Sequence, residues 1–480
     1  MSKTFHARLA LLGLTALLLG ACTLGPQYQR PEIAVPPVYR EDAPWKEAAP
    51  ADHLPKDDWW RLYGDTTLNA LQNEARLANQ DVAAAVARLE RARAAARISR
   101  ADLLPRLDLD PSARRGRTPE DLAPGTGGFT ATSLQLPLDL SYEIDLWGRV
   151  RRSVEAAGAE YQAGAADLHN LLLSVHAEVA RNYFGLRTLD AEIALLERTL
   201  SLREQNLRLV ESLFKNGQVG RLDVARAETE LASAEAEAAG LRRLRAQLEH
   251  ALALLVGRPV ADFSLPAAPL DLEPPAIAPG LPSALLERRP DVAAAERRMA
   301  AANARIGVAQ AAFFPAVRLT GSAGYGSNEL SSLFSWDNRA WSLGPAISLP
   351  IFDAGRNRAG LEQARAAHEE AVANYRQSLL IAFREVEDAL SDLRYLAEQG
   401  QAEDRATSSA REAAELSGKR YRAGLVSYLE VVDAERTALA SERAATRILG
   451  QRLQAGVSLI KALGGGWSDE VLPMVEPAGG

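Results

Sequence analysis

The sequence contains very little cysteine, few aromatic residues and no excess of positive charge. Its 480 residues include one cysteine, Cys22, which excludes an intramolecular disulfide or a cysteine-based zinc cluster. The chain has 55 Lys and Arg against 62 Asp and Glu, so a formal net charge of −7 leaves no basic footprint for nucleic acid. Aromatic residues make up only 6% of a chain that is 47% hydrophobic. A core built largely from Ala and Leu favours long, closely spaced helices.

A catalytic or metal-binding constellation is also missing from the sequence. The six histidines form no HExxH motif and no close metal pair. His169 and His176 lie seven residues apart on one face of an expected helix, and we assign them to packing or to the surface. No nucleophile elbow or phosphate loop is present. We therefore predict that the protein is not an enzyme and carries no cofactor.

The N-terminus has a charged start and then an apolar run that is too short to span a membrane. Lys3 and Arg8 precede the apolar residues 9–19, whereas a spanning helix needs ~20 residues. This pattern is typical of a secretory signal peptide. The sequence Leu19-Gly20-Ala21-Cys22 resembles a bacterial lipobox, which implies a lipoprotein signal peptide over residues 1–21 and an N-terminal lipid, including palmitate, on Cys22. A plain secretory signal with a chance cysteine is the alternative. Thr23 follows in place of the Asp that is linked with inner-membrane retention in such lipoproteins, so the resemblance implies sorting to the outer membrane.

Two tandem copies organise the rest of the chain. Leu104-Pro105 returns as Phe314-Pro315, Gly148-Arg149 as Gly355-Arg356, and Gly217 as Gly424, at an almost constant spacing. We predict repeat 1 over residues 64–258 and repeat 2 over residues 283–464. A proline-rich linker at 259–282 separates them, a proline-rich arm at 22–63 precedes them, and a tail at 465–480 follows.

Long proline-free stretches predict long helices in both copies. No proline occurs from 138 to 258 or from 351 to 472, and proline in a helix interior costs ~3 kcal/mol. Apolar residues from Leu168 to Phe214 recur mostly every three or four positions, as in a coiled-coil seam. Gly217 and Gly424 permit the left-handed turn that ends a helix. We predict helical hairpins over 148–258 and 355–464, each preceded by a shorter helix, at about 65–102 and 283–312.

Between the leading helix and the hairpin, each copy changes its apolar period to two. Leu134, Leu136, Leu138 and Leu140 alternate with polar residues, and Trp341, Leu343 and Ile347 do so in the second copy. We predict two β-hairpins, within about 105–145 and 315–351, with the strand length that spans an outer membrane. Two soluble hairpins are the alternative. Four strands cannot close a barrel alone, so in lipid they imply an oligomer, either a dimer with eight strands or a trimer with twelve.

Three motifs connect this architecture with a known family. They are Asp58-Trp59-Trp60-Arg61-Leu62-Tyr63-Gly64-Asp65, Leu286-Glu287-Arg288-Arg289-Pro290-Asp291-Val292 and Lys461-Ala462-Leu463-Gly464-Gly465-Gly466-Trp467. Together they resemble the outer-membrane efflux factors of the TolC superfamily, in the branch of OprM/NodT-type lipoproteins. The resemblance implies a mostly α-helical homotrimer with a shared twelve-stranded β-barrel. It also implies a periplasmic helical tunnel that docks through a periplasmic adaptor protein onto an inner-membrane pump.

The resemblance also carries roles onto particular residues. Glu430 and Asp433 match an acidic ring that narrows the periplasmic entrance, and three chains would place six carboxylates around one axis. Tyr421 and Asp223 match positions that tie neighbouring hairpins shut. Val426 stands where the family has an arginine, which puts the ionic part of that lock in doubt. The adaptor-contacting tips correspond to Gly217, Val219, Gly424 and Leu425.

Two other classes of protein also fit part of the sequence. A periplasmic coiled-coil lipoprotein that bridges the two membranes without a pore explains the long helices and the lipid. It does not explain two alternating hairpins at equivalent points of both copies. A lipid-anchored hydrolase lacks every motif that such chemistry needs. The exported molecule, the adaptor and the pump stay open at this level.

Overall fold

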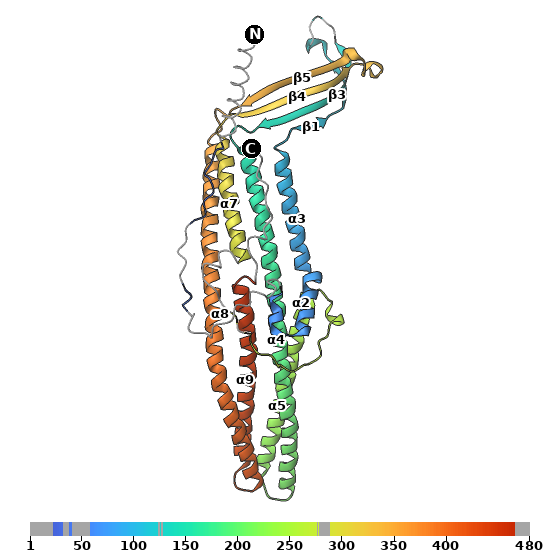
Figure 1. Cartoon of the computed structure of the whole chain (residues 1–480). Coiled ribbons are helices and arrows are strands. Elements are labelled where there is room, and N and C mark those ends of the chain that lie inside the picture. The colour runs from blue at the N-terminus through green and yellow to red at the C-terminus, as the bar shows by residue number, and fades with distance from the viewer. Residues whose placement is uncertain are drawn as a thin grey trace.

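The computed structural model describes residues 23–31, 38–40, 58–122, 125, 128–275, 277 and 289–465. The predicted signal peptide, Cys22 and most of the tail at 465–480 lie outside this part of the chain. Long helices run from a β-sheet at one end of the molecule to the other end, where two helical hairpins reverse direction (Figure 1). The helices are α2 (Thr66–Ala78), α3 (Gln80–Ala101), α4 (Arg149–Lys215), α5 (Arg221–Leu255), α7 (Pro290–Ala311), α8 (Arg356–Arg422) and α9 (Tyr428–Ala462). The strands are β1 (Arg106–Leu109), β2 (Ser112–Thr118), β3 (Phe129–Ile144), β4 (Ala316–Ser327) and β5 (Arg339–Ser348).

The two longest helices, α4 and α8, have 67 residues each. At ~1.5 Å per residue each is about 100 Å long. Each begins after a glycine with positive φ, Gly148 at 79° and Gly355 at 85°. An aspartate just before that glycine caps the first turn: Asp145 accepts from Val150 N at 3.0 Å, and Asp353 accepts from Asn357 N at 3.0 Å. The two copies therefore start their long helices by the same local device.

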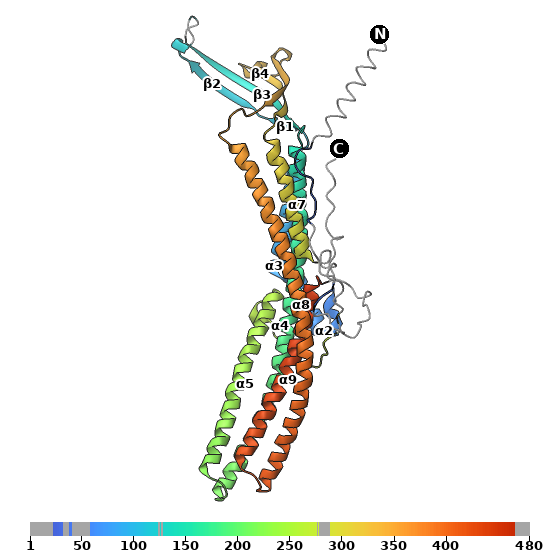
Figure 2. The ribbon, with the colours of Figure 1, turned by 90° about the vertical axis from the view of Figure 1, so that its left-hand side faces the viewer.

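The helices form two sets along the long axis. In the half nearer the sheet, α3 and α7 accompany α4 and α8, and in the other half α5 and α9 take their place (Figures 1 and 2). The contacts agree, because α4 packs against α3, α5, α7 and α9, while α8 packs against α7 and α9. The expected class, mostly helical with a β-sheet and two tandem copies, is confirmed.

The leading helix of the first copy is broken, where one continuous helix over about 65–102 was expected. Asn79 has an extended backbone (ψ 126°) between α2 and α3. Its side-chain oxygen accepts from Asp81 N at 2.9 Å and Val82 N at 3.1 Å, so it caps α3. Its amide donates to the carbonyl of Leu255 at 2.9 Å, in the last turn of α5. The end of α5 thus contacts the break between α2 and α3. The helical periodicity of the sequence alone does not reveal this break.

The family motif around residue 60 forms a short 3₁₀ turn, η1 (Trp59–Tyr63), that packs into the core at mid-height. Trp60 stacks on His176 with ring centroids 4.4 Å apart, and Gln72 Oε1 lies 2.6 Å from His176 Nδ1. Burial, and secondarily the charge of Arg76, lowers the pKa of His176 to about 4. His176 is therefore a neutral packing residue. Tyr63 packs on Phe184 in the same cluster.

The strands form one antiparallel sheet in the order β1-β3-β4-β5, with β2 also paired to β3. β1 and β2 share one register on β3, because Leu109 faces Leu138 and Ser112 faces Gln135. They are a single strand interrupted at Asp110 and Pro111, and proline lacks the N–H that a ladder needs. The sheet thus has four strand positions, with one edge at β1/β2 and the other at β5. Among the described residues, no helix is long and apolar enough to cross a membrane.

The register separates the residues of the sheet into two faces. Leu138 and Leu140 of β3 stand beside Ala323 and Gly321 of β4, which in turn stand beside Trp341 and Leu343 of β5. This face is apolar and open: Trp341 is 81% and Ile347 is 71% exposed. Asp139, Ser141 and Glu143 occupy the opposite face, next to Ser322, Thr320 and Arg318 of β4. One face is therefore suited to nonpolar surroundings and the other face to water.

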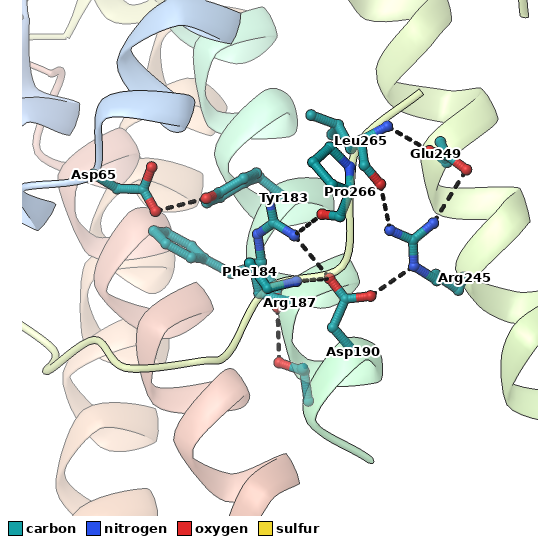
Figure 3. Close-up of polar contacts among 11 residues, drawn as sticks. Asp65, Tyr183, Phe184, Arg187, Asp190, Arg245, Glu249, Leu265 and Pro266 are labelled. Carbon is teal, nitrogen blue, oxygen red and sulfur yellow. Dashed lines mark hydrogen bonds and ion pairs between the residues drawn. The ribbon is translucent and has the colours of Figure 1, made fainter. Parts of the chain in front are cut away.

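Polar contacts hold the linker after α5 to the centre of the helical part (Figure 3). Asp190 of α4 accepts from Arg187 at 2.8 Å and from Arg245 of α5 at 2.6 Å. Both arginines also donate to linker carbonyls, Arg187 to Pro266 at 2.9 Å and Arg245 to Leu265 at 2.6 Å. Leu265 N donates to Glu249 at 2.6 Å. The first part of the linker is thus an ordered strap across α4 and α5.

Candidate functional site at the hairpin tips

Each helical hairpin reverses at a left-handed glycine. Gly217 has φ 70° and Gly424 has φ 73°. At the first tip Gln218 N donates to the carbonyl of Leu213 at 2.9 Å, and at the second Leu425 N donates to that of Arg420 at 3.0 Å. The N–H of each glycine also donates to the carbonyl three residues before it. The two bonds together make each turn a Schellman motif. A Cβ at either glycine would meet no atom within 4 Å, so both tips project into open space.

Immediately above the turns, an apolar cluster joins the two hairpins. Its buried members are Val210 of α4, Val224 and Ala227 of α5, and Tyr428, Val431 and Val432 of α9. Val219 packs against this cluster from the first turn, whereas Leu425 on the second turn is 68% exposed. The predicted tip residues thus differ: Val219 is half-buried, and Gly217, Gly424 and Leu425 lie at the surface.

The structure brings Tyr421 and Asp223 near each other across the two hairpins. The Tyr421 ring stacks on Tyr428 with centroids 5.5 Å apart. Burial raises the pKa of Tyr421, and the charge of Asp223 adds to the shift. Among the described residues the buried Tyr421 hydroxyl has no hydrogen-bond partner, and Asp223 forms a loose pair with Arg226 at 3.5 Å. No direct link joins Tyr421 to Asp223 within one chain.

Glu430 and Asp433 lie together on the exposed side of α9. Glu430 is in its first turn and Asp433 is almost one turn further along, while Val431 and Val432 between them face the apolar cluster. Both carboxylates are solvent-exposed. One chain therefore presents two adjacent exposed acidic groups close to the tip, on α9 beside the two valines that face the apolar cluster.

Sequence reasoning missed a layer of buried charge two turns above the tips. Glu230 of α5 pairs with Arg203 of α4 at 3.1 Å and with Arg436 of α9. Beside it, Asn206 of α4 donates to Glu435 of α9 at 2.9 Å, and burial raises the pKa of Glu435. These contacts tie three helices of two repeats together. Arg436 and Glu230, and likewise Asn206 and Glu435, are more than 200 residues apart in sequence, so no local motif predicts these contacts between the repeats.

A second charged layer lies higher, around Glu192 of α4, whose side chain is 3% exposed. Arg443 Nε donates to Glu192 at 3.0 Å and Arg447 donates through two nitrogens at 3.0 and 2.8 Å. Both arginines belong to α9, and Arg443 also contacts Glu237 of α5. This layer joins the first long helix to the second hairpin. It belongs to no predicted site.

The N-terminal arm is anchored at the junction of sheet and helices. A Cβ on Gly148, at the start of α4, would lie 2.7 Å from Thr23. Leu24 N donates to the carbonyl of Trp147 at 3.1 Å, and Asn303 of α7 donates to that of Pro26 at 3.0 Å. Further along, Arg40 N donates to Glu387 at 2.7 Å. The arm therefore runs from the sheet down the helices, with residue 23 at the sheet end.

A metal site does not emerge from the described residues, because no group of three or more His, Cys, Asp or Glu side chains is placed to hold an ion. The fold, the two-faced sheet and the hairpin tips can be compared with known proteins instead. The family model described as "Outer membrane efflux protein" matches residues 71–258 and 281–465. These two segments correspond to the two copies.

Individual proteins match over nearly the full length. Outer membrane protein OprJ of Pseudomonas aeruginosa is 39% identical over 97% of this chain and 97% of its own. Toluene efflux pump outer membrane protein TtgF of Pseudomonas putida is 35% identical over 97% of this chain and 98% of its own. The crystal structure of the open state of the Neisseria gonorrhoeae MtrE outer membrane channel matches with a TM-score of 0.83 at 35% identity. It covers 93% of this chain and 98% of that one.

Proposed function

Because this chain belongs to the outer membrane efflux protein family, we propose that three copies close one barrel in the outer membrane and continue it as a helical duct into the periplasm. The two-faced sheet is the observation that carries the proposal. Its apolar face, on which Trp341 and Ile347 are largely exposed, is suited to lipid, and its polar face is suited to a water-filled lumen. The protein is thus the outer-membrane channel of an efflux system.

The open edges of the sheet make the oligomer necessary. Within the described residues β1/β2 pairs only with β3, and β5 pairs only with β4, so each outer edge has unpaired backbone groups. In lipid each such group costs several kcal/mol. β5 runs toward the helices and β1/β2 runs away from them, so β5 of one copy can pair antiparallel with β1/β2 of the next. Eight strands from a dimer or twelve from a trimer close the sheet, and the family favours twelve.

The oligomer is tested by its mass and its heat sensitivity. We expect the purified, unboiled protein to have the mass of three chains in native mass spectrometry and to migrate as one compact species on a gel. Boiling should release single chains, since it separates the paired edges. A species of one or two chains contradicts the proposed trimer.

We further propose that the tips at Gly217 to Val219 and Gly424 to Leu425 dock a periplasmic adaptor, which connects the duct to an inner-membrane pump. Exposure of Leu425 and the open surroundings of both glycines support a docking role. Since the unpaired Tyr421 hydroxyl is buried near Asp223, we propose that it bonds to a neighbouring copy in the closed state. Adaptor binding to splayed tips would then stabilise the open state.

Glu430 and Asp433 are proposed to form the acidic ring at the closed entrance. Their exposure and their position on the same side of α9 support this role, since three copies would focus six carboxylates on the channel axis. We expect Glu430→Gln/Asp433→Asn trimers in planar bilayers to lose cation preference and block by divalent cations. Glu228→Gln, an exposed acid of α5 near the first tip, removes one charge per chain away from α9 and should retain both properties. Unchanged cation block in the double variant contradicts the ring.

Lipid attachment at Cys22 completes the proposal. The arm supports it because residue 23 lies beside Gly148, where the helices meet the sheet, so an anchor on the preceding residue would be at the height of the membrane surface. Cys22→Ser should abolish the incorporation of labelled palmitate. Incorporation that persists in Cys22→Ser contradicts this assignment.

A further inference from the structure

The charges of the sheet are distributed unequally over its two faces. On the polar face Arg106, Arg114 and Arg318 are balanced by Asp108, Asp139 and Glu143, and Arg318 lies 3.9 Å from Glu143. The apolar face has no acidic residue at any ladder position of the five strands. Its only charged ladder residues are three arginines: Arg115, Arg117 and Arg339. All the charge at the ladder positions of this face is therefore positive.

The register fixes the face of each of these arginines. On β2, Ala113 faces Leu134, and Arg115 and Arg117 follow on the same face opposite Thr132 and Thr130. On β5, Arg339 faces Tyr325 of β4, which in turn faces Leu136 of β3. The three arginines thus share the face of the leucines, although the sequence Ser112-Ala113-Arg114-Arg115-Gly116-Arg117 gives no apolar alternation there.

All three arginines lie at the end of the sheet farthest from the helices. β2 ends and β3 begins at the far end of the sheet in Figures 1 and 2, and so do the end of β4 and the start of β5. Arg115 and Arg117 are the last outward positions of β2, and Arg339 is the first residue of β5. In the proposed barrel this end reaches the outer leaflet, since the helices occupy the periplasm. Because β2 and β5 are the two edge strands, each boundary between copies would bring all three arginines together.

An outward arginine at this height is suited to a phosphorylated headgroup. Arginine in the centre of a lipid-facing strand is costly, but near the interface the cost falls almost to zero. The Arg339 guanidinium lies over the ring of Trp336, and its Nε donates to the Trp336 carbonyl at 2.7 Å. Its two terminal nitrogens have no partner among the described residues, and Arg115 and Arg117 are exposed without a described ion pair. Guanidinium groups bind phosphate oxygens in pairs.

We propose that Arg115, Arg117 and Arg339 form a binding site for the phosphate groups of outer-leaflet glycolipid at each boundary between copies. The inference rests on the proposed function, because it needs the barrel orientation and the paired edges. The apolar residues below the arginines would hold the acyl chains, and the arginines would hold the headgroup charge. The lipid would thereby bridge two copies and stabilise the trimer.

Binding of lipid A with two phosphates to the detergent-purified trimer tests the site, measured by native mass spectrometry. We expect Arg115→Gln/Arg117→Gln/Arg339→Gln to bind at least roughly tenfold more weakly than the wild type, since each arginine near a lipid headgroup adds a favourable charge contact. The matched control, Arg106→Gln/Arg114→Gln/Arg318→Gln, removes the same charge from the opposite face and should bind as the wild type does. Lysine at the three outward positions should restore most of the affinity.

Comparison with lipid A that lacks both phosphates separates headgroup from acyl-chain recognition in the unaltered protein. The wild type should bind the dephosphorylated lipid as weakly as the glutamine variant binds the phosphorylated one. Equal binding of both lipids by the wild-type trimer, or equal losses in the two triple glutamine variants, would overturn the arginine assignment alone. A wild-type protein that forms no trimer would instead contradict the proposed function.

Discussion

Replacing Glu192 by glutamine tests whether the upper charged layer holds the second hairpin to α4. The Glu192 carboxylate is buried and accepts from Arg443 at 3.0 Å and from Arg447 at 2.8 Å. Removing one partner of a buried ion pair typically costs ~3–5 kcal/mol. Here Arg447 is half-exposed and Arg443 keeps its contact with Glu237, so solvent and that carboxylate compensate for part of the loss. We expect the free energy of local opening of α9 to fall by about 2 kcal/mol.

Hydrogen exchange of the trimer measures this opening directly. A loss of about 2 kcal/mol corresponds to roughly 30-fold faster exchange of the amides around Arg443 and Arg447. The control is Glu197→Gln on the same helix, whose ion pair with Arg242 is exposed on both sides. It should change exchange by no more than about fivefold, since exposed pairs contribute ~0.2–1 kcal/mol. Exchange in Glu192→Gln that matches Glu197→Gln would refute the reasoning.

Three further changes probe other parts of the fold. Gly424→Val forces a β-branched residue into a backbone conformation with φ 73°, at a cost of ~1–2 kcal/mol. It should abolish export while the trimer persists. Gly424→Asn should retain export, because asparagine tolerates this conformation. Because the pKa of His176 is lowered to about 4, folding should lose up to about 3 kcal/mol as the pH falls from 6.5 to 4. His176→Phe should remove this dependence from urea midpoints, and a midpoint that still follows pH would assign it to other groups. Asn79→Ala removes a helix cap and the bond to Leu255, so we expect a loss of about 2 kcal/mol and faster proteolysis between α2 and α3. An unchanged cleavage rate would show that the cap is dispensable.

Local patterns in the sequence were sufficient for most of the secondary structure, but not for the break between α2 and α3 at Asn79. Proline-free stretches and three-four spacing predicted α4 and α8, and period-two alternation predicted β3 and β5, because both signals depend only on neighbouring residues. It did not predict β2, whose residues 112–117 show no apolar alternation. Gly217 and Gly424 predicted the tips, since positive φ favours glycine wherever it occurs. The spacing between the two copies predicted their equivalence. The assignment of Glu430, Asp433, Tyr421 and Asp223 to a gate came from family resemblance and stays a prediction.

The tertiary structure decided what depends on residues far apart in the chain. Glu192 meets Arg443 across 251 positions, and Asn79 meets Leu255 across 176, so neither contact leaves a local pattern. The face of Arg115 and Arg117 follows from the register of β2 on β3, which the interruption at Pro111 leaves unshifted. Sequence periodicity fixes which side chains share a face of one element. Only packing fixes which elements meet, because long-range contacts form wherever the free energy of the whole chain is lowest.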